Sequence, residues 1–487
     1  GTDNTAVGVL ALENTTTGAN NTGIGRSALA ANTTGAYNTA NGWEALNNNT
    51  TASFNTATGI QALKNTTTGS NNTATGRGSL ESNTTGQDNT ASGYYSLVSN
   101  TTGHYNTAMG REALRNNVSG QKNSAFGQNA LYNNTASNNV AVGAAALFAN
   151  TTGANNTAVG RASLEANTTG ADNTSTGFKS SVSNTTGSNN AVFGKEAFYT
   201  NTIGSSNTAI GQWALYYNTT ANNNTAVGRS SLESNTTGEN NTSGGQVSLY
   251  NNTTGGTNTA FGRASMYANT TGAGNVAMGV DALTANTTGS NSTAIGRDAL
   301  KANTTGSLNV ALGRHALLAC TTGSDNTGIG TYALDSTTTG NSNIAIGHGA
   351  ISTSSTASGQ CTLGNSAISN LRCNDTSISS LSDSRDKTDV VDSPFGLDFI
   401  NTVRPVQFLW DTRDGNVKDG TTRIGFLAQE LLAATNGNNA VLDLVLDDNP
   451  DKLEAKYGNL LPIMVQAIQE LSTQNAALEA RLAALEA

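Results

Sequence analysis

The sequence predicts a mostly β protein: a parallel β-solenoid or β-roll of about 22 coils, then a small α+β domain that ends in a coiled-coil helix. A glycine recurs 22 times from Gly8 to Gly364, and 20 of the 21 intervals are 17 residues long. All four prolines follow this repeat, and the last quarter of the chain lacks the period. A strict short period is typical of stacked copies of one supersecondary unit.

The pattern around each glycine predicts the contents of one coil. One short run of small or apolar residues precedes the glycine, as Ala226 and Val227 precede Gly228. A second run follows it, as Ala214 and Leu215 follow Gly211. N-T-T-G turns separate the runs, so the pattern indicates strands and turns rather than helix. We therefore expect two short strands per coil and a thin core of two small residues, one variable apolar residue and one leucine.

The column four residues before the glycine is Asn in 20 of 22 coils, with Ser292 and Gln360 as exceptions. Identical amides that stack can donate in one direction and accept in the other, so this column predicts a hydrogen-bonded ladder at a coil corner. The glycines are expected at positive φ or where backbones approach closely. The one 16-residue interval, from Gly127 to Gly143, is expected to shorten a turn. Because the core is thin, we expect lateral association into an oligomer.

The repeats resemble the head of trimeric bacterial adhesins, a left-handed parallel β-roll with S/N-x-A-x-G coils, over roughly residues 1–370. The 17-residue coil is longer than the adhesin coil, so the handedness is left open.

The column after the leucine is expected to point outward, and it is aromatic in six coils. Two interpretations are open: a face on which saccharides stack, or lateral packing between chains. Trp213 fits either. The six residues are Tyr132, Phe148, Tyr199, Tyr216, Tyr250 and Tyr267.

Charge and composition exclude several function classes. The net charge is −9, and residues 382–487 supply most of it with 9 Lys+Arg against 17 Asp+Glu. Nucleic-acid binding is not expected, because it requires basic patches. No apolar run approaches the ~20 residues of a membrane-spanning helix, so no membrane insertion is expected. The three cysteines lack metal-ligand spacing, so neither a metal nor another cofactor is expected.

Four motifs follow the repeat in a fixed order. They are L-S-D-S-R-D-K (Leu381–Lys387), G-L-D-F-I-N-T-V-R-P-V-Q-F-L-W (Gly396–Trp410), R-I-G-F-L-A-Q-E-L (Arg423–Leu431) and Y-G-N-L-L-P-I-M-V-Q-A-I-Q-E-L (Tyr457–Leu471). This set closely resembles the C-terminal intramolecular chaperone and auto-processing peptidase domain of phage endosialidases, tail spikes and tail fibres. The resemblance implies a linker at 371–381, the chaperone domain at 382–456 and a final helix at 457–487.

The resemblance also implies a serine–lysine dyad. The matching residues are Ser382 and Lys387, with self-cleavage between Leu381 and Ser382. A serine hydroxyl needs a general base, and a neutral lysine serves if burial depresses its pKa. Ser384 is a rival nucleophile that lies off the family position.

Three residues are expected to support the dyad. Asp383 and Arg385 match the motif, and Glu430 belongs to G-F-L-A-Q-E. The alternative interpretation is that L-S-D-S-R-D-K is only a solvated helix start, with Ser382 or Asp383 as its N-cap.

The final segment predicts a coiled-coil helix with a seam at alternating spacings of three and four residues. Asn475 is the one polar seam residue, a feature that fixes register. The seam alone does not give the number of strands, and the family resemblance implies three. The seam residues are Leu461, Met464, Ile468, Leu471, Asn475, Leu478, Leu482 and Leu485.

Together these features predict a homotrimeric phage tail fibre or spike that binds a host cell-surface glycan or protein receptor. Other virion tail proteins are expected to bind an N-terminal part that is missing here. The expected location is the virion, and the host cytoplasm during assembly, and self-cleavage is the only enzymatic activity expected. One alternative is a capsule depolymerase, which needs paired carboxylates that this rod is poor in. The other is a bacterial surface adhesin, which needs a membrane anchor.

Overall fold

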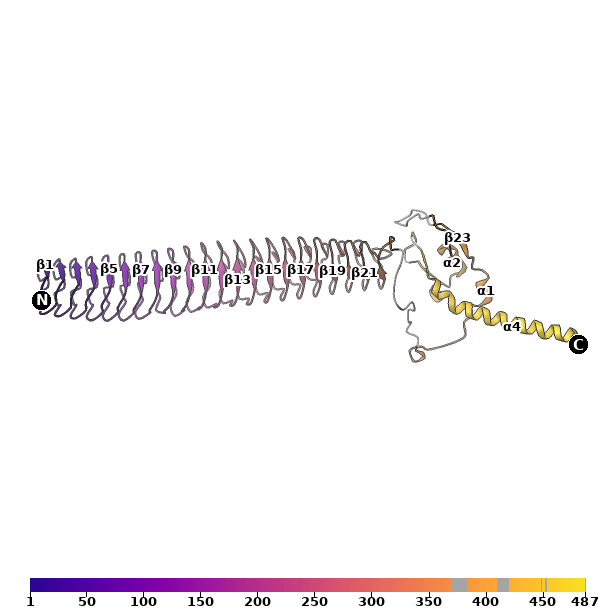
Figure 1. Ribbon diagram of the computed structural model, residues 1–487, viewed down its shortest axis with the longest axis horizontal. Helices are drawn as coiled ribbons and strands as arrows, with labels where there is room; N and C mark the ends of the chain where they lie inside the picture. The colour runs from indigo at the N-terminus through magenta and orange to yellow at the C-terminus, as the bar shows by residue number, and fades with distance from the viewer. Residues whose placement is uncertain (369–382, 410–419, 448, 452, 487) are drawn as a thin grey trace. The chain divides into compact units, whose positions relative to one another are not determined.

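The computed structural model describes the whole chain except residues 369–382, 410–419, 448, 452 and 487. Two compact units comprise residues 1–325 and residues 326–487. The first unit is a straight stack of coils whose strands lie along one side (Figure 1).

Each coil contributes one three-residue strand, and successive strands of the first unit pair in parallel, as β13 and β14 do through Ala209 and Ala226. Register passes through the shortened coil unbroken, because Ser124 pairs with Val140. The strands of the first unit are β1 (Thr5–Val7), β2 (Thr22–Ile24), β3 (Thr39–Asn41), β4 (Thr56–Thr58), β5 (Thr73–Thr75), β6 (Thr90–Ser92), β7 (Thr107–Met109), β8 (Ser124–Phe126), β9 (Val140–Val142), β10 (Thr157–Val159), β11 (Thr174–Thr176), β12 (Ala191–Phe193), β13 (Thr208–Ile210), β14 (Thr225–Val227), β15 (Thr242–Gly244), β16 (Thr259–Phe261), β17 (Val276–Met278), β18 (Thr293–Ile295) and β19 (Val310–Leu312).

The second unit begins with three strands of the same kind, which pair in parallel with each other. They are β20 (Thr327–Ile329), β21 (Ile344–Ile346) and β22 (Cys361–Leu363). The predicted parallel solenoid with a 17-residue period is therefore confirmed.

The prediction of two strands per coil is wrong. The Ala-Leu run after the glycine forms turns, because two of its residues adopt left-handed backbone conformations, as Trp213 (φ 61°) and Leu215 (φ 50°) do. Left-handed residues break the pleat of a strand. The run still bonds to the next coil, since the Leu215 N–H donates to the Ser231 carbonyl at 3.0 Å.

The prediction that the variable apolar residue directly before the glycine lies in the core is also wrong. Successive strand side chains point to opposite faces, so burial of Ala226 turns Val227 outward, where it is 42% exposed. The interior holds the alanine before the glycine, the small residue and the leucine after it, and buried asparagines. The polar residues Asn41, Thr58 and Thr75 in the variable column therefore leave the core intact.

The predicted asparagine ladder is confirmed. Asn207 is buried, and its Oδ1 accepts from the backbone N–H of Asn224 at 2.9 Å. Its Nδ2 donates to the Ala221 carbonyl at 2.9 Å. Each amide thus bonds mainly to the backbone of the next coil, and the side-chain contact to Asn190 is longer, at 3.3 Å.

A second buried ladder was not predicted. It is formed by the Asn of the N-T-T-G turn, as in Asn252, whose Nδ2 donates to Asn235 Oδ1 at 2.8 Å and to the Gly255 carbonyl at 2.9 Å.

This second ladder is interrupted at three places. Asn49, Asn117 and Asn303 each have a buried Oδ1 without a hydrogen-bond partner. Asn49 is followed in the column by Thr66 and Asn303 by Cys320, while Asn117 precedes the shortened coil. In that coil the Asn134 Nδ2 donates to the Ala136 carbonyl at 2.8 Å instead.

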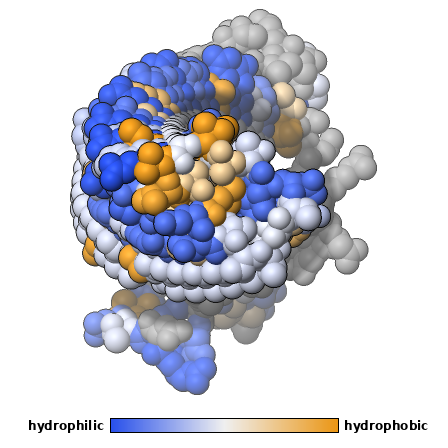
Figure 2. Space-filling view, turned by 90° about the vertical axis from the view of Figure 1, so that its left-hand side faces the viewer, coloured by the Kyte–Doolittle hydropathy of each residue, from blue (hydrophilic) through white to orange (hydrophobic). Residues whose placement is uncertain are grey.

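The periodic glycines combine a positive φ with a close approach of neighbouring backbones, as expected. Gly211 has φ 130°, and a Cβ there would lie 2.6 Å from the Gly228 carbonyl oxygen. Seen from the N-terminal end, apolar residues fill the middle of the terminal coil and mostly polar residues surround them (Figure 2).

The rest of the second unit is a small α+β domain. Its elements are η1 (Ser384–Asp386), α1 (Leu397–Ile400), β23 (Val406–Phe408), β24 (Arg423–Gly425), α2 (Ala428–Ala434), α3 (Asn439–Leu442), β25 (Val445–Leu446), β26 (Glu454–Ala455), η2 (Tyr457–Asn459) and α4 (Leu460–Glu486). β23 pairs antiparallel with β24, and β25 with β26. Its core contains Phe399, Leu431, Val445, Leu460 and Ile463.

The predicted final helix is present as α4, and its apolar seam is exposed along this chain, from Leu461 at 65% to Leu485 at 84%. Its pairing with other copies stays a prediction. In the described residues, no helix combines the length and apolar character needed to cross a membrane.

Replacing Asn207 with Leu should lower the melting temperature of the rod. The change removes buried bonds to two coils and leaves backbone groups unpaired, at a cost of roughly 1–3 kcal/mol. Thermal unfolding followed by circular dichroism measures the shift, with Thr220→Leu at an exposed position of the same coil as control. Equal melting temperatures for both variants would contradict a structural ladder.

Replacing Thr66 with Asn should stabilise the rod, because the new amide would complete the second ladder between Asn49 and Asn83. We expect a gain of about 1 kcal/mol, the net value of one buried hydrogen bond. Thr68→Asn, at an exposed position of the same turn, is the matched control. A melting temperature at or below that of the control would show that the gap costs nothing.

Candidate auto-processing site

The segment that carries the predicted dyad is only partly within the described residues. Leu381 and Ser382 fall outside the described residues, so the structure does not place the nucleophile. Lys387 is exposed and ends η1, where its backbone N–H donates to the Ser384 carbonyl at 3.3 Å. The dyad geometry is thus untested.

Asp383 is the N-cap of η1. Its Oδ1 accepts from the Arg385 N–H at 2.9 Å, and its carboxylate also pairs with the Arg385 guanidinium. Hydrogen bonds from that guanidinium and backbone lower the pKa of Asp383. The N-cap of the alternative interpretation is therefore present at Asp383, and the role of Asp383 and Arg385 in supporting the dyad stays a prediction.

Glu430 lies at the start of α2 and pairs with Arg404, whose Nε is 2.9 Å from Oε2. The hydrogen bond from Arg404 lowers the pKa of Glu430. This contact joins the G-F-L-A-Q-E motif to the arginine of the motif before it. The structure thus gives Glu430 a partner other than the dyad.

Glu470 of α4 joins two further motifs. Its Oε2 accepts from the Leu397 N–H at the start of α1 at 2.8 Å, and its Oε1 accepts from Gln466 at 3.0 Å. The bond from the Leu397 backbone is the main reason why the pKa of Glu470 is lowered. A Cβ on Gly396 would lie 2.2 Å from this carboxylate, so a larger residue there would require the Glu470 side chain to move.

Tyr457 links the last motif to the third. Its ring meets Phe426 edge-on at 5.4 Å between centroids, and its hydroxyl accepts from the Phe426 N–H at 3.3 Å. All four motifs therefore have local or cross-motif contacts in one small domain.

Residues 382–442 match the family model described as chaperone of endosialidase. The C-terminal domain is a chaperone-of-endosialidase domain. No curated protein and no solved structure matches the chain.

A pocket of about 510 Å³ opens in the chaperone domain, and neither Lys387 nor Glu430 lines it. Its walls come from the end of α2, from α3 and from β25. The lining residues are Leu432, Thr435, Gly437, Asn439, Ala440, Asp443, Val445, Leu446 and Asp447.

The aromatic column of the rod is half-buried, and its rings stack in pairs between coils. Tyr199 and Tyr216 are 5.0 Å apart and nearly parallel, and Tyr250 and Tyr267 are 5.1 Å apart. Tyr132 and Phe148 form a third pair at 5.1 Å. Coils lie about 4.8 Å apart, so each pair covers one face of each ring. The role of these six residues in saccharide binding stays a prediction.

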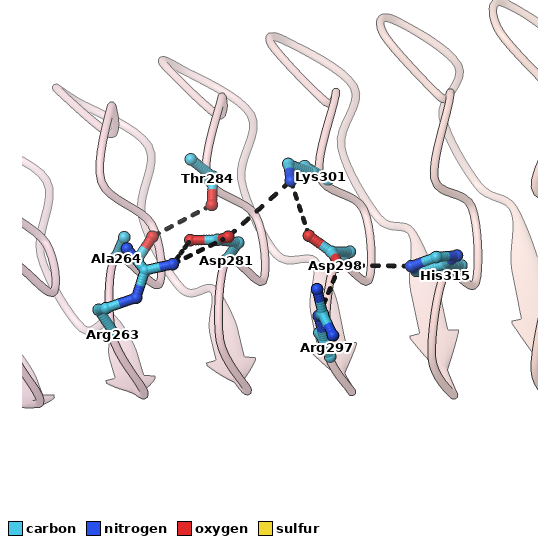
Figure 3. Close-up of polar contacts among 8 residues, drawn as sticks. All are labelled: Arg263, Ala264, Asp281, Thr284, Arg297, Asp298, Lys301 and His315. Atoms are coloured by element: carbon cyan, nitrogen blue, oxygen red, sulfur yellow. Dashed lines mark hydrogen bonds and ion pairs between the residues drawn. The ribbon is translucent and has the colours of Figure 1, made fainter.

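A chain of ionic contacts runs along four coils of the rod (Figure 3). Asp298 is nearly buried and lies 2.7 Å from Lys301 Nζ, 3.1 Å from Arg297 Nε and 3.3 Å from His315 Nε2. Burial raises the pKa of Asp298, but the hydrogen bond and charge of Lys301, with Arg297 and His315, outweigh it and lower the pKa. Asp281 extends the chain through Lys301 at 3.9 Å.

The charged side chains of this chain of contacts pair with one another, an arrangement that stabilises adjacent coils. Within the described part of the chain, no group of three or more His, Cys, Asp or Glu residues could hold a metal ion.

Sequence reasoning missed Arg404 and Glu470 as organising residues of the chaperone domain. Both stood inside motifs that were recognised, R-P-V and A-I-Q-E-L. Their partners are 26 and 73 residues away, and spacing alone does not reveal such pairs.

Replacing Glu470 with Gln should destabilise the chaperone domain at neutral pH, because a carboxylate accepts a stronger bond from the Leu397 N–H than an amide does. The lowered pKa of Glu470 means that its contribution is present above its unfolded pKa, near 4.3, and is lost as pH falls through the folded value.

The melting temperatures of wild type and Glu470→Gln should thus differ most near pH 7 and converge in acid. Glu479→Gln on the exposed part of α4 is the control. A difference that persists unchanged at pH 3 would rule out the carboxylate as its source.

Proposed function

We propose that the chain is the subunit of a homotrimeric phage tail fibre or tail spike. In this proposal the solenoid is the host-facing shaft, and the chaperone domain aligns three chains, promotes their folding and then cleaves itself off. One observation carries the proposal: a chaperone-of-endosialidase domain follows a solenoid whose coils are nearly interchangeable.

The need for a chaperone follows from the repeat. A shift of one whole coil leaves almost every ladder, leucine and glycine facing its equivalent, so the shaft carries little register information. Parallel pairing also forms slowly, because non-local contacts must be nucleated before they stabilise the chain. The aperiodic domain and the exposed seam of α4, marked by Asn475, supply the information that the repeats lack.

Self-cleavage in this proposal would use the serine–lysine dyad. The Ser382 hydroxyl would attack the Leu381 carbonyl carbon while Lys387 takes the hydroxyl proton, and that proton would pass to the Ser382 nitrogen as the C–N bond breaks. Water would then hydrolyse the resulting ester between Leu381 and the Ser382 side chain, which frees the Leu381 carboxyl group and restores the Ser382 hydroxyl. Neutral lysine requires removal from water. Lys387 is exposed in a single chain, and additional copies of the domain would provide that shielding.

The shaft would serve host attachment through a glycan or protein receptor, with the virion as its site of action. Other virion tail proteins would be its further partners. The carboxylates Glu44, Glu112 and Asp298 are paired with lysine or arginine, an arrangement that favours a binding shaft over a depolymerase.

Cleavage is tested by mass spectrometry of the purified full chain. Wild type should yield a fragment of about 106 residues that begins at Ser382. Ser382→Ala and Lys387→Ala should each leave the chain intact, whereas Ser384→Ala should still be cleaved. Cleavage of both dyad variants would sink the serine–lysine assignment.

The chaperone role is tested by omitting the domain. Residues 1–381 expressed directly should form aggregates or misfolded single chains, because the repeats alone do not align three copies. The same residues matured from the full chain should remain a heat-resistant trimer, as measured by light scattering and unheated gels. A soluble trimer from the short chain would show that the domain is dispensable.

A further inference from the structure

One outward surface of the rod is built differently from the others. We call it the strand face: the residues three and one before each periodic glycine, which flank the buried alanine. In the second of these columns Ile210, Val227 and Phe261 are 40%, 42% and 44% exposed. These side chains stand in a row along the parallel strands, with successive members paired through the register.

The strand face contains no Asp, Glu, Lys or Arg in any of the 22 strands. Its first column is mostly threonine, and its second is mostly Val, Ile, Met, Phe or Leu from Met109 onward. Charged residues instead occupy the column directly after the glycine, next to the strand face. This column includes Arg229, Arg263 and Arg297. A solvated surface of this length would be expected to carry charges, as the neighbouring column does.

The apolar second column is continuous even at the coil where it lacks a large residue. Gly244 occupies the second column, and the Phe261 ring of the next coil lies across it, since a Cβ on Gly244 would be 2.4 Å from that ring. The apolar surface thus continues over the one coil that lacks a side chain.

We propose that the strand face is the surface through which copies of this chain pack against one another along the rod. This inference rests on the proposed trimer and names its interface. A second copy is the occupant because the face repeats at the coil spacing of about 4.8 Å. Another copy of the same rod presents mostly apolar groups at that spacing from Met109 onward.

The available area also fits a second copy. The 19 strands of the first unit, at about 4.8 Å each and roughly 10 Å wide, offer on the order of 900 Å² per copy. A stable interface needs about 800 Å² per partner. The alternative surface for lateral packing, the aromatic column, already has its rings stacked on one another in pairs.

Cross-linking of the full chain tests the proposal. In a Cys361→Ser, Cys373→Ser background, which keeps buried Cys320, Val227→Cys introduces one thiol on the strand face. Tyr217→Cys is the matched control, since Tyr217 is 50% exposed but lies in the turn segment between β13 and β14. Ile295→Cys is a second variant on the strand face, in case Val227→Cys disturbs folding.

With a short bismaleimide, Val227→Cys and Ile295→Cys should each give a band of twice the chain mass on a denaturing gel, at least tenfold stronger than in Tyr217→Cys. Light scattering before cross-linking reports whether the copies are assembled. Assembled chains with cross-links only through Tyr217→Cys, or through none of the variants, would overturn the interface and leave the trimer standing. A single-chain mass would overturn both.

Discussion

Buried amides that bond one coil to the next are the constraint on which the rod depends. The interior of each coil holds only two small residues and a leucine, so apolar burial alone is modest. Two asparagine columns complete it by satisfying carbonyls and N–H groups that face inward, as Asn207 and Asn252 do. A buried polar group stabilises only when it is paired. Each coil is therefore stable only when it packs against a coil of the same kind. This condition fails where a buried Oδ1 has no hydrogen-bond partner, at Asn49, Asn117 and Asn303.

Sequence periodicity was sufficient to predict the solenoid, the first ladder, the glycine geometry and the buried leucines. It did not predict the conformation of the Ala-Leu run, because left-handed residues such as Leu215 leave no mark in composition. The sequence analysis also placed the column of Val227 in the core, although strand alternation turns Val227 outward once Ala226 lies inside. In the C-terminal domain the motifs predicted the family, and the Asp383 cap belonged to the alternative interpretation of a solvated helix start. The pairs Arg404–Glu430 and Leu397–Glu470 join residues far apart in sequence, and only the fold brings them together.

The rod and the chaperone domain differ in how far apart in sequence their contacting residues lie. In the rod a coil contacts only itself and the adjacent coils, so stability grows with length while information about position does not. In the chaperone domain the contacts Arg404–Glu430 and Leu397–Glu470 join distant segments, so few residues define one arrangement. Under the proposed function, the domain after the repeats would give the uniform rod a defined starting point, which a rod held together by nearest neighbours would need only while it forms.

The shortened coil shows what kinds of length change the rod tolerates. Losing one residue between Gly127 and Gly143 kept the strands in register but cost a ladder bond at Asn117. Gain or loss of a whole coil, seventeen codons in the gene, would instead join surfaces that already match. Recombination between repeats can therefore lengthen or shorten the rod in whole-coil increments, and its length can evolve without any redesign of its interior.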